Sequence, residues 1–360
     1  MSACFQLAGP EDSADILRLF RDTPQRGRVV INFEREPDYF LGGRVICEQP
    51  EVHISRGNSG ELVMLYAIGR RTLYINGLPT TVRYAHDLRL AEQARGGRMI
   101  LRMARYVGDR LGPEELIQTV ILNENRDSLN SVASGRAGLP GYYPCGDIET
   151  SLVFRMPAFT HHDLLIRPAE QDDVGDMQAF HDRHAPDRQF YPRYCFADIG
   201  TDNPYYAGLS LSDYWLAYRG SELVGMAALW DQKAFKQTRV VSYPPGLSGL
   251  RHLWNLWSRL FGGLHLPPAG GTLRYLMLHS VLVRNDEVDV LRALLSRMSR
   301  HAGQQQAALS AGFFVDDPLR HALRGSRRQL MGSRHYLIGY FGDPRSRLDG
   351  RRGYIELARL

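Results

Sequence analysis

Apolar and polar residues follow the same order near the start of the chain and again near its middle. Residues 5–20 (FQLAGPEDSADILRLF) predict a short strand, an acidic turn and an amphipathic helix. Residues 166–180 (IRPAEQDDVGDMQAF) repeat this order, and Asp173 takes the place of Asp12. Carboxylates ahead of an apolar period favour a helix N-terminus, because its free amide groups and its dipole attract negative charge. We therefore predict a strand and a helix at both places.

A strand meander is predicted in the first half of the chain. The runs EVHISRG (51–57), ELVMLYAIG (61–69) and RTLYING (71–77) read as strands that end in Gly or Asn, which is typical of antiparallel strands joined by turns. Beyond them the pattern predicts a strand at 81–90, a helix at 99–107, a strand at 118–122 and a helix at 126–134.

A second match indicates an internal repeat. Residues 81–84 (TVRY) and 272–275 (TLRY) each open an apolar strand that leads into a helix. The two matches differ in spacing, which fits an insertion near 244–271. A chain of 360 residues also exceeds the size at which one hydrophobic core stops growing. We predict an α/β fold of two tandem domains, 1–157 and 163–360, each a mostly antiparallel mixed sheet flanked by helices.

The predicted insertion contains an aromatic helix within residues 250–264. One face of this helix carries Leu253, Trp254, Trp257, Leu260 and Phe261. Such a face is typical of a core or an interface, and a wall for an aromatic substrate is the alternative. We do not expect contact with a membrane, because the polar face carries only Arg251, His252 and Arg259.

Composition is that of a globular protein, with 44% apolar and 23% charged residues. No apolar run approaches the roughly 20 residues of a membrane span, and no secretory leader is recognised. Four scattered cysteines without CxxC spacing favour a reducing compartment over disulfides or zinc. We expect a cytoplasmic protein without a metal. His161 and His162 are expected to be exposed linker residues rather than metal ligands.

Positive charge collects in residues 320–360, which hold ten arginines against three carboxylates. Such a basic tail can attract a polyanion. However, only Lys233 and Lys236 are lysines in a chain of net charge +5. The preference for arginine therefore looks compositional, and we do not expect the chain to bind nucleic acid.

A glycine-rich turn between the strand at 81–90 and the following helix holds the candidate chemistry. Glycines let backbone amides approach an anion, and a helix N-terminus supplies free N–H groups and partial positive charge. Arg95 and Arg98 add charged donors. The turn is not GxGxxG and lacks the GK[ST] of a nucleotide-triphosphate loop. A plain connection between strand and helix is the alternative.

In this context the segment resembles the GNAT superfamily of N-acetyltransferases, whose signature is [Q/R]-x-x-G-x-[G/A] between the fourth strand and the third helix. Gln93 and Gly96 occupy its first and fourth positions, and Arg98 stands where the family prefers Gly or Ala. Asn123 or Asn125 matches the asparagine often found after the fifth strand.

The resemblance implies acetyl-CoA as co-substrate, held where the fourth and fifth strands splay apart, and no metal. The implied cofactor-binding residues are Leu88, Arg89 and Leu90 for the pantetheine arm, and Gln93, Ala94, Arg95, Gly96, Gly97 and Arg98 for the pyrophosphate. Asn123 and Asn125, after the fifth strand, are the remaining implied cofactor-binding residues. The backbone N–H of Leu88 is the implied donor to the thioester oxygen.

The second half of the chain lacks such a loop. The repeat aligns it with residues 284–289 (RNDEVD), where Asp286, Glu287 and Asp289 would repel a pyrophosphate. We expect this half to pack against the first, to complete the acceptor pocket or to dimerise.

Acyl transfer to an amine needs a base near the thioester and an acid for the leaving thiolate. His86 and Asp87 are the candidate bases, but neighbouring strand residues face opposite ways. We prefer His86, because the ordinary pKa of histidine lies near neutrality; a structural histidine is the alternative. The resemblance implies a tyrosine where Val132 stands. Tyr142 and Tyr143 are therefore the candidate acids, with packing roles as the alternative.

The resemblance thus predicts an enzyme that moves an acetyl group from acetyl-CoA to a small amine by direct attack, with its site in residues 1–157. A non-catalytic acyl-CoA-binding or interaction protein is the alternative, and a homodimer is left open.

Overall fold

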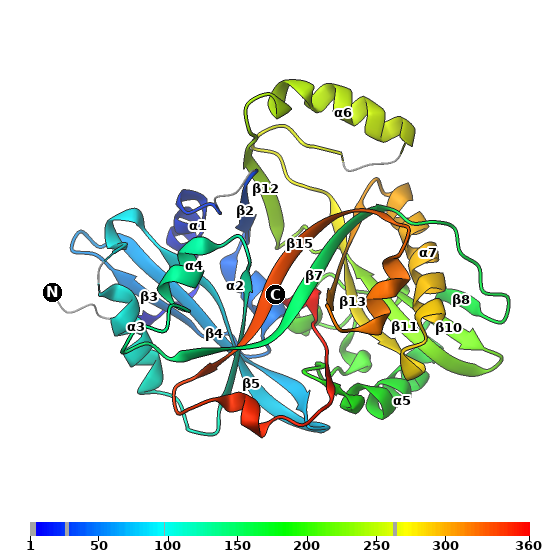
Figure 1. The fold of residues 1–360 in the computed structure, drawn as a ribbon, viewed down its shortest axis with the longest axis horizontal. Coiled ribbons are helices and arrows are strands. Elements are labelled where there is room, and N and C mark those ends of the chain that lie inside the picture. The colour runs from blue at the N-terminus through cyan, green and yellow to red at the C-terminus, as the bar shows by residue number, and fades with distance from the viewer. Residues whose placement is uncertain (1–4, 26–28, 97, 262–264) are drawn as a thin grey trace.

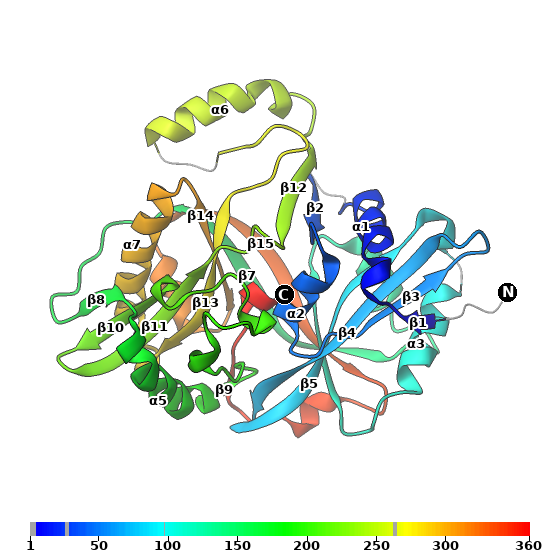
Figure 2. The same cartoon turned by 180° about the vertical axis from the view of Figure 1, so that it is seen from behind.

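Twelve strands form one sheet in this computed structural model, which describes residues 5–25, 29–96, 98–261 and 265–360 (Figures 1 and 2). Their order is β1-β3-β4-β5-β6-β15-β7-β14-β13-β11-β10-β8. Their bounds are β1 Phe5–Leu7, β3 Val52–Arg56, β4 Leu62–Ile75, β5 Leu78–Leu90, β6 Leu116–Leu122, β7 Gly141–Arg155, β8 Leu165–Pro168, β10 Tyr214–Arg219, β11 Glu222–Trp230, β13 Tyr275–Val283, β14 Ala308–Phe314 and β15 Arg327–Gly339.

Two short pairs complete the strands of the described residues, β2 (Val30–Glu34) with β12 (Gln237–Ser242) and β9 (Arg188–Gln189) with β16 (Arg352–Gly353). The α-helices are α1 Ser13–Asp22, α2 Tyr39–Ile46, α3 Met99–Gly108, α4 Arg126–Ser131, α5 Val174–His184, α6 Leu247–Phe261 and α7 Val288–Gln304. The mixed α/β architecture predicted from the sequence is confirmed. Within the described residues, no helix combines the length and the hydropathy that crossing a membrane requires.

Helices cover both faces of the sheet in the first half. Ile16 of α1 and Tyr39 of α2 pack with Leu65 of β4 on one face. On the other face, Met103 of α3 packs with Met64 of the same strand. Because side chains alternate along a strand, neighbouring β4 residues reach opposite helical layers, and both layers bury apolar surface.

The largest apolar cluster lies in the second half of the chain. It joins Met177 of α5 and Leu294 of α7 to Trp230 of β11 and Leu278 of β13. The apolar strand and the helix predicted after residues 272–275 correspond to β13 and α7. The strand–helix order predicted at 166–180 corresponds to β8 and α5.

The strand β15 joins the two halves. It pairs antiparallel with β6 on one side and with β7 on the other, and β7 in turn pairs with β14 (Figure 1). The sheet is therefore continuous across the predicted boundary at residues 157–163. The two-domain division stays a prediction.

The expectation of a basic tail in residues 320–360 is wrong. This segment contributes the long central strand β15, and Ala358 and Arg359 are fully buried. Arginines of the segment form ion pairs with carboxylates beside them in space, as Arg345 does with Asp343 and Arg334 with Asp147. A central strand is held by backbone hydrogen bonds on both of its sides, so this segment is an integral part of the fold and not a free tail.

One predicted turn in the meander is absent. The runs at 61–69 and 71–77 form the single strand β4, which passes straight through Gly69. A Cβ at Gly69 would lie 2.6 Å from Cβ and 2.7 Å from Sγ of Cys47, so this glycine allows a close approach rather than a turn. The real turn lies at Asn76 and Gly77, whose φ angles of 53° and 81° suit a tight hairpin.

Candidate active site

An opening between β5 and β6 forms the centre of the candidate site. The two strands pair in parallel only from Val82 to Tyr84, against Leu116 to Gln118. Beyond Tyr84, β5 continues to Leu90 without a described strand partner on this side. The backbone groups of residues 85–90 therefore face an opening, where an extended ligand could bond them as an added strand would. The splay of these two strands, which the resemblance implied, is present.

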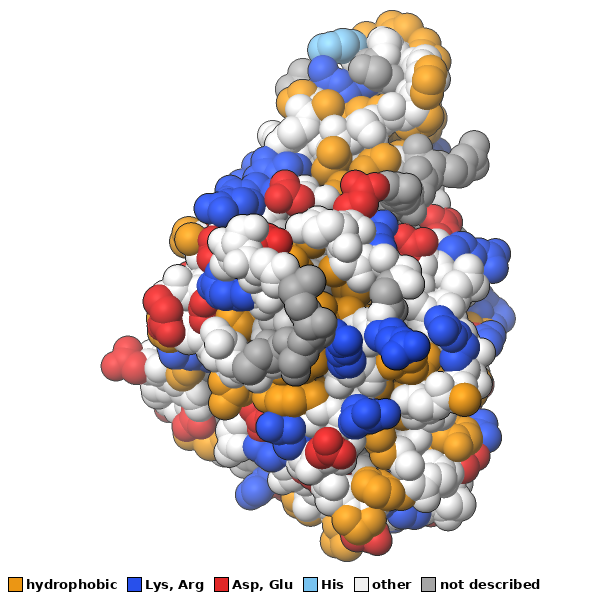
Figure 3. Space-filling view, turned by 90° about the vertical axis from the view of Figure 1, so that its left-hand side faces the viewer, with side chains coloured by type: hydrophobic (Ala, Val, Ile, Leu, Met, Phe, Trp, Pro, Cys, Tyr) orange, Lys and Arg blue, Asp and Glu red, His pale blue; other side chains and the backbone are white. Residues whose placement is uncertain are grey.

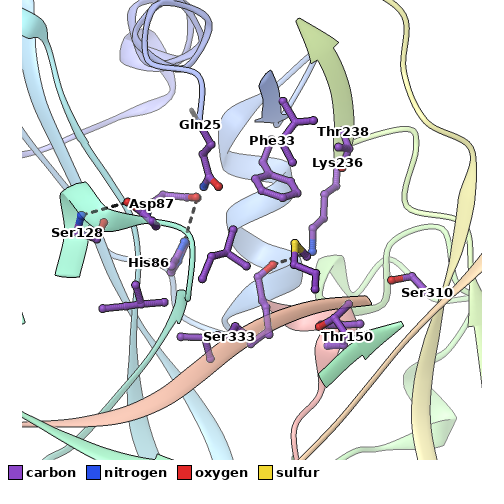
Figure 4. Close-up of a pocket in the computed structure, with 18 of the residues that line it drawn as sticks. Gln25, Phe33, His86, Asp87, Ser128, Thr150, Lys236, Thr238, Ser310 and Ser333 are labelled. Carbon is purple, nitrogen blue, oxygen red and sulfur yellow. Dashed lines mark hydrogen bonds and ion pairs between the residues drawn. The ribbon is translucent and has the colours of Figure 1, made fainter. Parts of the chain in front are cut away.

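A cavity of about 500 Å³ occupies this opening and extends toward the second half. Its walls come from β5, β6 and α4 on one side and from β2, β12, β13, β14, β7 and β15 on the other. Figure 4 shows His86 and Asp87 at one side of this space and Lys236 at another, with Thr150, Ser310 and Ser333 on the intervening strands. The lining is otherwise mainly apolar, as expected of a small-molecule site.

His86 and Asp87 both reach this cavity, and the expectation that only one of them could is wrong. Asp87 adopts φ 51°, and the register of β5 against β4 shifts between Arg89 and His86. This bulge breaks the alternation of side chains, so that neighbouring residues turn toward the same space. His86 Nδ1 lies 3.0 Å from Asp87 Oδ2, and within the described residues His86 Nε2 is buried without a hydrogen-bond partner.

A buried ion pair holds Asp87 in its charged form. Arg35 Nη2 lies 3.5 Å from Asp87 Oδ1, and the Tyr39 hydroxyl donates to Oδ2 at 3.4 Å. Burial by itself raises the pKa of Asp87, but the charge of Arg35 and the hydrogen-bonding contact with His86 outweigh it and hold this pKa far below its ordinary value. A charged Asp87 orients His86 through Nδ1, and Nε2 has no hydrogen-bond partner among the described residues, so it is the ring nitrogen left to act as a general base.

Lys236 is a site residue that the sequence did not single out for chemistry. Its Nζ donates to the Leu360 carbonyl at 2.7 Å, and its side chain lines the cavity. Burial, and then Arg35, lower the pKa of Lys236 to about 7. The only sequence signal was its rarity, since lysine occurs at just two positions.

Tyr142 and Val132 line the cavity, whereas Tyr143 does not. The ring of Tyr142 packs edge-on to Tyr336 at a centroid distance of 6.0 Å, and burial, followed by Tyr340, raises the pKa of Tyr142. Tyr143 lies instead against Gly141 and Gly339, with the Arg345 guanidinium 5.5 Å from its ring centroid. The successive strand residues Tyr142 and Tyr143 point to opposite faces, and only the first faces the cavity.

The predicted phosphate loop lies at the open end of β5. Glu92–Ala94 form a 3-10 turn, and α3 begins at Met99 with Arg98 as the preceding cap residue. Gly96 adopts φ 73°, and a Cβ built on it would meet no atom within 4 Å. Gln93, Arg95 and Arg98 are exposed, Ala94 is half-buried, and Gly97 lies outside the described residues.

Other predicted cofactor residues divide between the cavity and its surroundings. Leu88, Arg89 and Asn125 line the cavity. Leu90 packs against the apolar layer beneath α3, and Asn123 packs against Gly332. The Arg89 guanidinium points away from the opening, because it donates to the Thr23 carbonyl at 2.8 Å. It also lies over the Phe20 ring.

The open loop and α4 are joined by an ion pair. Arg95 Nη1 lies 3.7 Å from Asp127 Oδ2 in the first turn of α4. The side chain of Asn125 caps this helix by accepting from the Ser128 amide at 3.1 Å. The loop after β5 and the loop after β6 thus meet at one edge of the opening, as the parallel direction of the two strands requires.

Residues 284–289 carry no comparable loop. Asp286 pairs with Arg188 and Arg352, and Glu287 pairs with Arg219 at 2.8 Å. Arginines thus balance Asp286 and Glu287, two of the carboxylates that were expected to repel a phosphate, and these pairs tie the segment after β13 to β9, β10 and β16. Among the described residues, no group of His, Cys, Asp and Glu is placed to hold a metal ion.

No protein-family model and no curated protein matches this sequence. Solved structures do match its fold. A GCN5-related N-acetyltransferase from Sphaerobacter thermophilus has a TM-score of 0.53 at 12% identity, covering 99% of this chain and 98% of that one. N-myristoyltransferase from Saccharomyces cerevisiae, solved with bound myristoyl-CoA, has a TM-score of 0.58 at 10% identity, covering 96% and 81%.

A third match is to a fungal multi-domain GH3 β-N-acetylglucosaminidase with a GCN5-related glucosamine N-acetyltransferase region. Its TM-score is 0.60 at 12% identity. The match covers 94% of this chain but only 38% of that protein. These likenesses, together with the splayed β5 and β6, show that the chain has the fold of the GCN5-related N-acetyltransferases.

Proposed function

We propose that the chain is an acyl-CoA-dependent N-acyltransferase whose site is the cavity beside β5. The observation that carries this proposal is the His86–Asp87 pair, which a bulge turns toward the cavity at the point where β5 loses its neighbour. The acyl-CoA supplies the acyl group as a thioester. The free edge of residues 85–90 would hold its extended arm, and the open loop at Gly96 would hold its phosphates.

His86 is the base in this proposal. As the C–N bond of the product forms and the thioester C–S bond breaks, the amine loses a proton to His86 Nε2 and the thiolate takes one up. Asp87 keeps the ring oriented and stabilises the imidazolium that forms. The Leu88 amide follows the bulge and is the proposed donor to the carbonyl oxygen, on which negative charge develops. Tyr142 faces the same cavity and is the proposed acid.

The proposal also includes a duplicated origin for the two halves. Asp87 and Ser280 both have φ above 50°, and each follows a histidine in a strand that pairs in parallel over three residues with the next. Aligning His86 with His279 shifts one half by two residues relative to the alignment of TVRY with TLRY. In the second half, His279 is fully buried beside Glu356, with Nδ1 3.1 Å from its carboxylate, and does not line the cavity. One active site per chain is therefore proposed.

Binding and transfer are tested separately. Calorimetric titration with acetyl-CoA and a longer acyl-CoA should show binding that Gly96→Glu weakens at least tenfold, because the new carboxylate repels phosphate and fills the loop. Gly220→Glu is the matched control, since Gly220 also has positive φ and open surroundings but lies in the β10–β11 hairpin. Equal weakening in both variants would contradict the assignment of the loop.

Thiol release with a panel of small amines then measures transfer. His86→Gln should lower kcat by about 10²–10⁴-fold while the affinity for acyl-CoA stays unchanged. Unaltered kcat in this variant would reject His86 as the base. Tight binding without thiol release for any amine would favour the alternative, a non-catalytic acyl-CoA-binding protein.

A further inference from the structure

The helix α6 projects from the rest of the molecule above the β2–β12 pair (Figures 1 and 2). Its polar side faces the returning chain. The side-chain amide of Asn255 donates to the Leu266 carbonyl at 2.9 Å and accepts from the Leu266 amide at 2.8 Å. Ser258 is buried on the same side. The helix is therefore fastened to the protein through its polar residues.

The apolar side of α6 faces outward, the reverse of an ordinary surface helix. Its exposed apolar residues are Leu250 (57%), Leu253 (66%), Trp254 (41%), Leu256 (58%) and Trp257 (45%). Figure 3 shows hydrophobic side chains on the outside of this projection. Of the face expected to be core or interface, Leu253, Trp254 and Trp257 are exposed, and the side chains of Leu260 and Phe261 lie outside the described residues. A patch of five large apolar side chains on one helix is a docking surface rather than a chance exposure.

The segment that carries α6 has no acidic residue of its own. No Asp or Glu occurs from Gln232 to Asn285, a stretch that includes α6 and both strands that carry it. Arg251 lies on the helix, and the Arg327 guanidinium lies 6.0 Å from the Trp257 ring centroid. Arg155 is the cross-strand partner of Arg327 and is exposed. Arginines thus lie on this apolar helix and beside it.

We propose that α6 docks on an anionic lipid surface. Leucine side chains would enter the acyl boundary, Trp254 and Trp257 would lie at the headgroup level, and the arginines would attract anionic headgroups. A second copy of the chain is a poorer partner, because two-fold packing of the same face would bring like charges together. The sequence alone predicted no membrane contact; the proposal departs from that prediction because the structure turns the apolar face outward.

Docking would also bring the cavity close to the lipid. Tyr243 and Leu266 line the cavity, and they lie on the two segments that connect α6 to the body. The Tyr243 hydroxyl donates to the Pro267 carbonyl at 2.8 Å, which joins these segments at the foot of the helix. A hydrophobic substrate held in the bilayer would therefore have a short path to the site.

Cosedimentation with lipid vesicles tests the proposal on the full chain. Vesicles that hold phosphatidylglycerol should bind the protein at least tenfold more tightly than vesicles of phosphatidylcholine alone, and added salt should weaken the binding. Leu253→Ser combined with Trp254→Ser should abolish binding. Leu78→Ser with Leu165→Ser is the matched control, because both leucines are exposed but lie on other elements. When anionic vesicles are added, tryptophan emission should shift to the blue in the wild type and in the control variant but not in the α6 variant.

Several results would overturn the proposal. It fails if the anionic vesicles do not bind the protein, or if the α6 variant binds them as well as the control variant does. Sedimentation velocity without lipid provides the remaining check. If the wild type is a dimer that Leu253→Ser with Trp254→Ser converts to a monomer, α6 is a contact between copies. Circular dichroism of the variants establishes that each remains folded.

Discussion

At residue 87, one backbone torsion decides the character of the site. Its φ of 51° lies in the left-handed region, which aspartate tolerates better than most residues but still at a cost. The ion pair with Arg35 and the contact with His86 Nδ1 help to offset this cost. Strain stored at a bulge thus places a carboxylate and an imidazole side by side, which regular strand geometry forbids.

Lys236 provides the prediction at the residue scale. Its pKa of about 7 in the folded chain lies below its ordinary value of 10.5. Between these two values the unfolded chain binds more protons than the folded chain, so Lys236 makes stability rise with pH. From pH 7 to pH 9 the gain should be about 2 kcal/mol, and Lys236→Met should remove it. Urea unfolding at both pH values measures the difference.

The other lysine serves as the control for this measurement. Lys233 is exposed, so Lys233→Met should leave the rise in stability between pH 7 and pH 9 as it is in the wild type. A rise that persists in Lys236→Met would show that other groups cause it.

At the scale of elements, close approach between segments sets which glycines are needed. Gly69 lets α2's end at Cys47 contact the middle of β4, and the strand stays straight through it. Gly225 in β11 plays the same part under α7, where a Cβ would lie 2.8 Å from Val290. Both glycines interrupt apolar strand patterns, and both serve packing rather than a turn.

Gly69→Val tests this packing role. Its Cβ would also lie 3.0 Å from the Gln49 carbonyl oxygen, which belongs to the backbone and cannot turn away as a side chain can. We expect a loss of at least about 2–3 kcal/mol in the free energy of unfolding, measured with urea. Gly175→Ala in α5 is the comparison, since open space surrounds it and a helix gains from alanine. If Gly69→Val lowered the free energy of unfolding by less than an ordinary surface substitution does, the packing role given to Gly69 would be contradicted.

For the whole molecule, residues 354–360 act as a clasp between the halves. Arg359 is fully buried, and its guanidinium donates to the carbonyls of Val45 in the first half and Tyr205 in the second. The Arg359 carbonyl accepts from Arg71, and Glu356 accepts from the Tyr194 hydroxyl at 2.9 Å. Together with β15, this segment makes the two halves one body.

Arg359→Leu should therefore destabilise the protein as a whole. It leaves two buried carbonyl groups without a donor and removes the cation stacked 3.5 Å from the Tyr205 ring centroid. We expect a loss of about 3 kcal/mol or more in the free energy of unfolding. Arg345→Leu removes an exposed pair with Asp343 and should leave the free energy of unfolding nearly unchanged. If both substitutions lowered the thermal unfolding temperature by the same amount, the role of residues 354–360 as a clasp would be refuted.

Local pattern determined much of the fold. Apolar periodicity placed α1, α3, α5 and α7, and the glycine-rich turn before α3 marked the loop whose open Gly96 the structure describes. These features depend on neighbours within a few residues, through helix period, capping and turn chemistry, and such information is written along the chain. His86, the candidate base, and Tyr142, a candidate acid, both line the cavity.

Long-range pairing was decided only by the tertiary structure. Alternation along a strand cannot reveal a bulge, so the joint presence of His86 and Asp87 in the cavity was missed. Nor can composition show that residues 327–339 enter the centre of the sheet, that Lys236 lines the same cavity as β5, or that α6 turns its apolar face outward. Each depends on segments far apart in the chain, whose contacts exist only once the whole sheet has formed.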